Sequence, residues 1–163
     1  MTKGTMQAKR QLVTFATAGE RFAADIFAVE RVLRYAPPRV LPNSAGWLRG
    51  VLEHAGQAIP VVDLRERLGL GASEPGPSAR ILVVNVGETK VGVTVDEVLA
   101  VRTVEAAAVE PPPAIYKGLA RDYLEGVVRH DGELYVVLAT AHLLTSTERI
   151  EMARAMATER HDG

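Results

Sequence analysis

The sequence predicts a mainly β protein made of two small barrels, and the main observation behind this prediction is a duplicated unit. Residues 47–68, WLRGVLEHAGQAIPVVDLRERL, align without a gap with residues 123–144, YLEGVVRHDGELYVVLATAHLL. Residues 19–33 also align with residues 87–101 when one residue is allowed for a turn. Val and Ile dominate these segments and Gly-containing turns separate them, which is typical of short strands in a small barrel or sandwich.

Each half of the chain is therefore expected to run hairpin, crossover, hairpin. Asp131-Gly132 is typical of a two-residue hairpin turn, because both central residues of a type I′ turn need a positive φ, and Ala55-Gly56 occupies the matching place. The expected strands cover residues 11–17, 22–26, 29–35, 48–53 and 58–62 in the first half, and residues 81–86, 90–95, 98–104, 124–129 and 134–138 in the second.

Few helices are expected. Asp63 can cap a short helix over residues 64–68, with Gly69 at the left-handed position that ends it. Thr145 and Glu148 form a capping box before a helix over residues 149–159. We expect that helix to dock on a barrel through an apolar face made of Ile150, Ala153, Met156 and Ala157.

The segment GLGASEPGPS, residues 69–78, is rich in Gly and Pro and is typical of a linker. We therefore expect a first barrel over residues 10–78, joined by the C-terminal helix at residues 146–160, and a second barrel over residues 79–144.

Composition excludes several classes of protein. The chain has 163 residues, of which 47% are hydrophobic and 24% charged, and this suits a compact soluble protein with a real core. Its apolar runs are far shorter than the roughly 20 residues that span a bilayer, so we expect no membrane insertion and a cytoplasmic location. A net charge of −1 argues against nucleic acid as a partner.

Candidate chemical groups have simpler explanations. His54 and His130 recur at matched positions, but matched positions in a duplicated fold fall in different barrels, so we expect solvated histidines rather than metal ligands. Asp63 is explained by helix capping and Asp96 by a turn. The sequence contains no cysteine, no phosphate-binding GxxxxGK loop and no nucleophile elbow. We therefore expect no enzymatic activity, no cofactor and no metal.

Four blocks in order carry a family resemblance: GERFAADIFAVERVLRY, WLRGVLEHAGQAIPVVDLRERLGL, ILVVNVGETKVGVTVDEVLAV and YLEGVVRHDGELYVVL. Together they resemble the bacterial chemotaxis coupling protein CheW over residues 10–145. The resemblance implies one CheW-like domain of two intertwined, five-stranded SH3-like β-barrels with a C-terminal helix. It also implies an adaptor at cytoplasmic receptor arrays, which links the tip helix of methyl-accepting chemoreceptors to the regulatory domain of the histidine kinase CheA.

The resemblance also suggests site residues. The receptor-binding positions correspond to Val29, Arg31, Val32, Gly50, Ala55 and Val98, and the kinase-binding positions to Ala58, Ile59, Glu110 and Ile115. Strict alternation along the strand places Val29 and Val32 on opposite sides, so one of them is expected outside the core, unless both are buried. Gly50 within a strand indicates close approach by a partner or by a neighbouring strand.

The chain departs from the family pattern at three of these positions. Ala55 replaces a signature arginine, Arg31 replaces a frequent glutamate, and Glu110 stands at a position that is usually basic. An alternative is therefore a divergent scaffold that binds only one of the usual partners, or other regulators outside the standard array. A third class, a small barrel that binds nucleic acid or a ligand by stacking, is disfavoured because only 5% of residues are aromatic.

Overall fold

The computed structural model describes residues 8–42, 46–71, 73–114 and 121–162, and all ten expected strands are present in it. Their bounds lie within two residues of the predicted ones. They are β1 (Lys9–Thr17), β2 (Glu20–Asp25), β3 (Val29–Arg34), β4 (Gly50–His54), β5 (Gln57–Asp63), β6 (Arg80–Val86), β7 (Thr89–Val95), β8 (Glu97–Glu105), β9 (Leu124–His130) and β10 (Glu133–Leu138).

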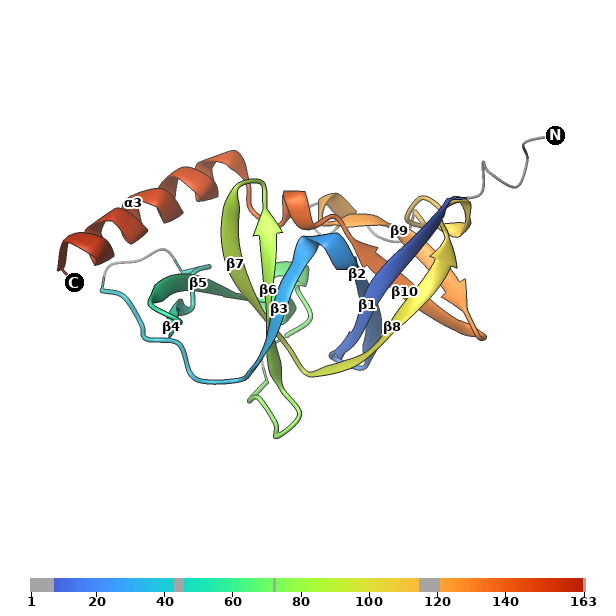
Figure 1. Cartoon of the computed structure of the whole chain (residues 1–163), viewed down its shortest axis with the longest axis horizontal. Helices are drawn as coiled ribbons and strands as arrows, with labels where there is room; N and C mark the ends of the chain where they lie inside the picture. Colours follow the sequence, from blue (N-terminus) through green and yellow to red (C-terminus); the bar gives the residue numbers. More distant parts are fainter. Residues whose placement is uncertain (1–7, 43–45, 72, 115–120, 163) are drawn as a thin grey trace.

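The strands form two five-stranded sheets. Sheet A has the order β8-β1-β2-β10-β9, and sheet B has the order β3-β6-β7-β5-β4. The first hairpin of each half pairs with the second hairpin of the other half, through the parallel pairs β2–β10 and β7–β5. The two sheets form two lobes side by side (Figure 1). Each sheet thus takes strands from both halves, and the predicted division between residues 78 and 79 does not coincide with the division between sheets.

A backbone pair closes each sheet into a barrel. The chain that continues from β3 pairs at Arg39 with Val51 of β4, through two backbone hydrogen bonds of 2.8 Å. The continuation of β8 pairs in the same way at Glu110 with Val127 of β9, again through two bonds of 2.8 Å. The edge strands at the two ends of each sheet are therefore joined by the segment that follows β3 or β8.

Gly50 and Gly126 lie at these two closures. A Cβ atom on Gly50 would lie 2.5 Å from the carbonyl oxygen of Arg39, and one on Gly126 would overlap the carbonyl oxygen of Glu110. Gly50 also has a φ of 149°. Of the two explanations open for Gly50, close approach by a neighbouring strand is therefore the one that the structure supports.

The largest core cluster lies between the two sheets. It combines residues of sheet A such as Phe15 and Phe22 with residues of sheet B such as Leu82, Val84 and Val93. A second cluster lies inside sheet A and includes Leu12, Val128 and Val137. Because apolar residues are buried on both faces of these strands, the sequence shows continuous apolar runs rather than clean alternation.

The two α-helices in the described part of the chain have the expected caps, and the second begins three residues before the expected range 149–159. In α1 (Leu64–Leu68), the Asp63 carboxylate accepts a 2.9 Å hydrogen bond from the Arg65 backbone N–H, and Gly69 ends the helix in the left-handed conformation. In α3 (Ser146–Asp162), the Thr145 hydroxyl accepts from the Glu148 N–H and the Glu148 carboxylate accepts from the Thr145 N–H. α3 lies along the lobe of sheet B (Figure 1).

The expected apolar face of α3 is partly wrong. Met152 is buried in the core, and Ala155 and Met156 pack against Leu41, Leu48 and Val51, whereas Ile150 is 55% exposed and Ala153 is exposed. Since Met152 and Met156 are four residues apart, they share one face, and Ile150 points away from it. The spacing of apolar residues along α3 therefore does not by itself identify the face that docks, because the Ile150 side chain lies in solvent.

Candidate functional site: the edge strands β3 and β8

A β-bulge sets the orientation of side chains along β3. Val29 lies opposite Val84 and Val32 lies opposite Leu82, and Glu30 is the extra residue between them. Residues directly opposite in a ladder point to the same face, so Val29 and Val32 both face the side on which Leu82 and Val84 pack against sheet A. Strict alternation, which placed the two valines on opposite sides, is therefore wrong here because of the bulge.

The same arrangement recurs on β8. Val98 lies opposite Phe15 and Val101 lies opposite Val13, and Leu99 is the extra residue. Phe15 belongs to the cluster between the sheets, so Val98 and Val101 face sheet B just as Val29 and Val32 face sheet A. We call these four residues (Val29, Val32, Val98 and Val101) the valine surface.

The valine surface lies partly in solvent. Val29 and Val98 are half-buried against the core between the sheets, while Val32 is 44% exposed and Val101 is 51% exposed. β3 and β8 are edge strands of different sheets, and Figure 1 shows both on the near side toward the middle of the molecule. Apolar side chains on such edges are an expected contact site for another protein.

Val101 was not among the predicted site residues. The signal that finds it is the structural repeat: with both bulges taken into account, Val101 holds the position in β8 that Val32 holds in β3. Sequence alignment with one unplaced turn residue leaves this correspondence ambiguous by one position, which in a strand means the opposite face.

The polar side of β3 is basic. Glu30 is paired with Lys90 at 2.9 Å, whereas Arg31 is exposed and its Nη1 lies 3.2 Å from Nε2 of His54. Ala55 follows in the hairpin turn with a φ of 52°. The structure thus brings Arg31 close to the turn that contains Ala55, and the group that Arg31 meets there is an imidazole rather than a carboxylate.

The predicted kinase-binding residues are placed less favourably for contact. Ile59 is buried in sheet B, and Ala58 is half-buried against the cluster that α3 covers. Glu110 is exposed and belongs to the barrel closure. Ile115 lies outside the described residues. Ala58 belongs to sheet B, whereas Glu110 extends sheet A.

Arg67 of α1 connects the two repeats with α3. Its guanidinium lies 5.7 Å from the Trp47 ring and 5.3 Å from the Tyr123 ring, which are the matched aromatic residues that open the two repeats. It also makes a bidentate ion pair with Glu148, with N–O distances of 2.8 and 2.6 Å. Its side chain is only 9% exposed.

The Arg67–Glu148 pair has shifted pKa values. Burial alone would raise the pKa of Glu148, but the hydrogen bonds from Arg67 and Thr145 more than offset burial, so this pKa lies below its ordinary value. Burial alone would lower the pKa of Arg67, but the hydrogen bond to Glu148 together with the charge interactions with Tyr123, Glu148 and Glu66 outweighs burial, so the pKa of Arg67 is raised. Both groups therefore stay charged at neutral pH, and the pair is charge-assisted.

Candidate metal ligands do not gather in the described ranges. No group of three or more His, Asp or Glu side chains there could hold a metal ion. His54 and His130 lie in different sheets. None of the helices there is both long enough and apolar enough to cross a membrane.

Comparison with known proteins agrees with this geometry. The model of the CheW-like domain family matches residues 11–148. The chain is 28% identical to the probable chemotaxis protein CheW of Rhizobium etli over 90% of its length and 94% of that protein, and 33% identical to protein FrzA of Myxococcus xanthus over 81% and 79%. It is similar to the crystal structure of the scaffolding protein TtCheW from Thermoanaerobacter tengcongensis, with a TM-score of 0.78, 26% identity, and coverage of 86% of this chain and 91% of that one.

Proposed function

The chain belongs to the CheW-like domain family of non-enzymatic chemotaxis scaffolds, and from this premise we propose that it couples chemoreceptors to a CheA-type histidine kinase. In this role it works at receptor arrays in the cytoplasm and has no cofactor. One part of its surface binds the tip helix of a methyl-accepting chemoreceptor, and another binds the regulatory domain of the kinase.

The valine surface is the observation that supports the receptor contact. Val32 and Val101 lie at equivalent places on two edge strands, both partly exposed, with Val29 and Val98 half-buried below them. A helix that packs across β3 and β8 would bury the exposed part of all four side chains at once. Recognition of an amphipathic helix by an apolar surface takes its affinity from this buried area.

The roles of the remaining predicted residues differ. Gly50 supports the site indirectly, since it permits the closure of sheet B at Arg39. Arg31 and Ala55 form the edge of the site and affect which partner is accepted. Of the predicted kinase contacts, Glu110 is the described residue whose side chain is exposed.

A second candidate function is a divergent scaffold that binds the receptor but not the usual kinase. The burial of Ile59 favours it, because this side chain cannot reach a partner in this conformation, and Ala58 is half-buried against the cluster contacted by α3. The two candidates share the receptor contact and differ only in the kinase.

Binding measurements with purified components separate these candidates. A panel of chemoreceptor tip fragments and the regulatory domain of CheA are titrated separately against the protein by isothermal titration calorimetry. Binding of both supports the coupling role, and binding of a receptor tip alone supports the divergent scaffold. If neither binds, the proposed function is wrong.

A further inference from the structure

Phe27 is the most exposed large apolar side chain among the described residues. It lies in the 3₁₀ turn Ile26–Ala28 between β2 and β3, and it is 89% exposed. A phenylalanine in that position loses the free energy of burial, roughly 2–3 kcal/mol, which the fold does not recover. The core clusters do not include it.

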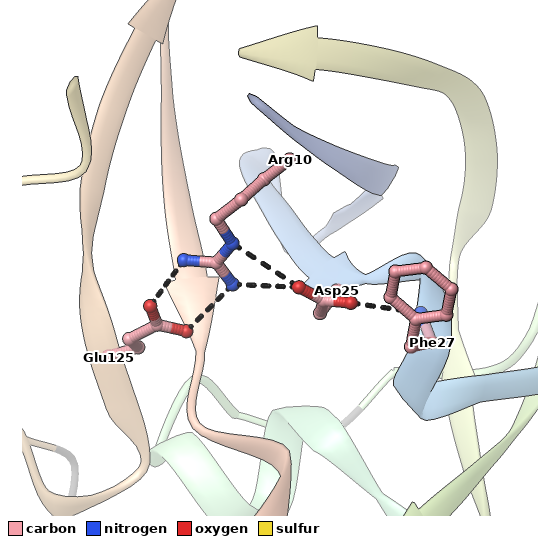
Figure 2. Close-up of polar contacts among 4 residues, drawn as sticks. All are labelled: Arg10, Asp25, Phe27 and Glu125. Carbon is pink, nitrogen blue, oxygen red and sulfur yellow. Dashed lines mark hydrogen bonds and ion pairs between the residues drawn. The ribbon is translucent and has the colours of Figure 1, made fainter. Parts of the chain in front are cut away.

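A network of charged side chains holds the turn in place. Asp25 Oδ1 accepts a 2.9 Å hydrogen bond from the Phe27 backbone N–H, and Asp25 Oδ2 accepts two bonds from Arg10, at 3.2 and 3.1 Å. Arg10 also donates two bonds to Glu125. Figure 2 shows the Arg10 guanidinium between the two carboxylates, with Phe27 at the end of the chain of contacts.

This network ties three strands together. Arg10 comes from β1, Asp25 from the end of β2 and Glu125 from β9. The hydrogen bond to Glu125 raises the pKa of Arg10, so the guanidinium keeps its charge throughout the range in which proteins fold. Because the turn is already ordered in the free protein, binding of a partner to Phe27 costs little entropy for ordering the backbone of the turn.

Phe27 lies in the turn that leads directly into β3 at Val29, the first residue of the valine surface. The backbone N–H of Val29 bonds to the carbonyl of Ile26 and so ends the same turn. Of the seven large apolar residues that are exposed in the described ranges, four lie in this turn, in β3 or in β8: Phe27, Val32, Leu99 and Val101. An exposed aromatic residue on a rigid turn beside an apolar surface has the properties of a binding hot spot.

The charges nearby indicate what kind of helix fits. Arg34 on β3 is exposed and lies opposite Arg80, so it shares the face of Val32 and Leu82, and it is not within ion-pair distance of a carboxylate in the described part of the chain. A partner with acidic residues beside its apolar stripe would neutralise this charge, whereas a basic partner would be repelled.

We propose that Phe27 is the anchor residue for an amphipathic partner helix with an acidic flank, and that Asp25 and Arg10 are positioning residues that hold its turn. This inference rests on the proposed receptor contact at the valine surface. Phe27 inserts beside the apolar stripe of the helix, and the acidic flank faces Arg34.

Substitutions at Phe27 and Asp25 test the anchor. Phe27→Ala is expected to lower affinity for a chemoreceptor tip fragment at least about tenfold, since truncation of a hot-spot aromatic residue has effects of this size. The thermal midpoint should not fall, because the ring is in solvent. The matched control is Ile150→Ala on α3, which removes a similarly exposed apolar group and should leave affinity unchanged.

A double-mutant cycle tests the positioning role. Asp25→Ala removes the acceptor for the Phe27 N–H and should weaken binding, whereas Asp25→Asn keeps a side-chain oxygen at this place and should weaken it less. If Asp25 acts through Phe27, the double variant Phe27→Ala with Asp25→Ala binds within about twofold of Phe27→Ala alone. Additive losses would overturn the positioning role.

Other outcomes distinguish this inference from the function on which it rests. If Phe27→Ala binds as tightly as the unmodified protein while Val32→Asp loses binding, Phe27 is not the anchor and the receptor contact stands. If both variants bind like the unmodified protein, the proposal that the valine surface contacts the receptor is wrong as well. If receptor-tip variants whose flanking acids are replaced by lysine bind as tightly as the unmodified tip, only the proposal of an acidic flank is refuted.

Discussion

Replacement of Val32 and Val101 by Asp is the most informative perturbation of the proposed receptor contact. Full burial of a valine is worth about 1.5–3 kcal/mol. Val32 is 44% exposed and Val101 is 51% exposed, so a partner that covers either one gains roughly 1 kcal/mol, a fivefold change in Kd. An unpaired carboxylate at the same place adds a desolvation cost, and we expect a total of about 3 kcal/mol, or a hundredfold weaker binding.

The assay compares affinity with stability. Affinity for a chemoreceptor tip fragment is measured by fluorescence anisotropy, and the thermal midpoint by circular dichroism. The midpoint should change little, because both side chains already lie partly in water. Val40→Asp is the matched control: Val40 is exposed but follows β3 outside the valine surface, so this variant should bind normally.

The critical result is whether the Val32 and Val101 variants lose the same amount of binding free energy. Because Val32 and Val101 hold equivalent places on β3 and β8, their Asp variants should lose similar amounts of binding energy. Loss of binding in the Val32 variant alone would show that the partner contacts one strand only. Loss of the folded state in both variants would show that the valines belong to the core, and the reasoning from their exposure would be refuted.

Three further predictions concern closure, pH and partner choice. Gly50→Ala should destabilise the fold by more than about 3 kcal/mol in urea unfolding, because the new Cβ overlaps backbone and φ is positive. The Arg67–Glu148 pair should stabilise the folded state fully above the pKa that Glu148 has in the unfolded chain, near 4.5. This stabilisation should be lost as pH falls through the lower pKa that Glu148 has in the folded protein, and urea unfolding between pH 7 and 3 measures the loss. The double replacement Arg31→Glu with Ala55→Arg should improve binding to a receptor tip from a standard array by more than the two single replacements together.

Each of these predictions has a control and a contradicting outcome. Gly56→Asn has open space and a left-handed φ of 79° that Asn tolerates, so it should be nearly neutral; equal effects at Gly50 and Gly56 would refute the closure argument. Glu148→Gln should have a flatter pH dependence than the unmodified protein, and identical curves would show that the pair is not responsible. If the unmodified protein already binds the standard tip as tightly as an ordinary coupling protein, Arg31 and Ala55 do not respecify it.

Local elements could be predicted from the sequence because their signals are local. The ten strands, the cap at Asp63, the capping box at Thr145 and the Asp131-Gly132 turn each depend on a few adjacent residues, and the structure contains all of them. The pairing of strands is different. Which hairpin meets which depends on contacts between distant segments, so the exchange of hairpins between the two halves is not visible in a linear repeat.

The candidate site shows the same limit at the level of single residues. The bulges at Glu30 and Leu99 each shift the register by one residue, and that shift reverses the faces of the side chains that follow. The family resemblance suggests Val29, Val32 and Val98 as candidates, but alternation could therefore not orient them or find Val101. Phe27 gives no sequence signal of its own, because an apolar residue in a turn is equally compatible with burial.

The central claim is that this chain joins a receptor to a kinase, and co-sedimentation tests it most directly. Receptor tip fragments are attached to lipid vesicles, the CheA regulatory domain is added, and the vesicles are pelleted with and without this protein. The account predicts that the kinase domain sediments only when this protein is present, and that the Val32→Asp variant abolishes this effect. Sedimentation of the kinase domain to the same extent without the protein, or its absence from the pellet in every mixture, would contradict the coupling role.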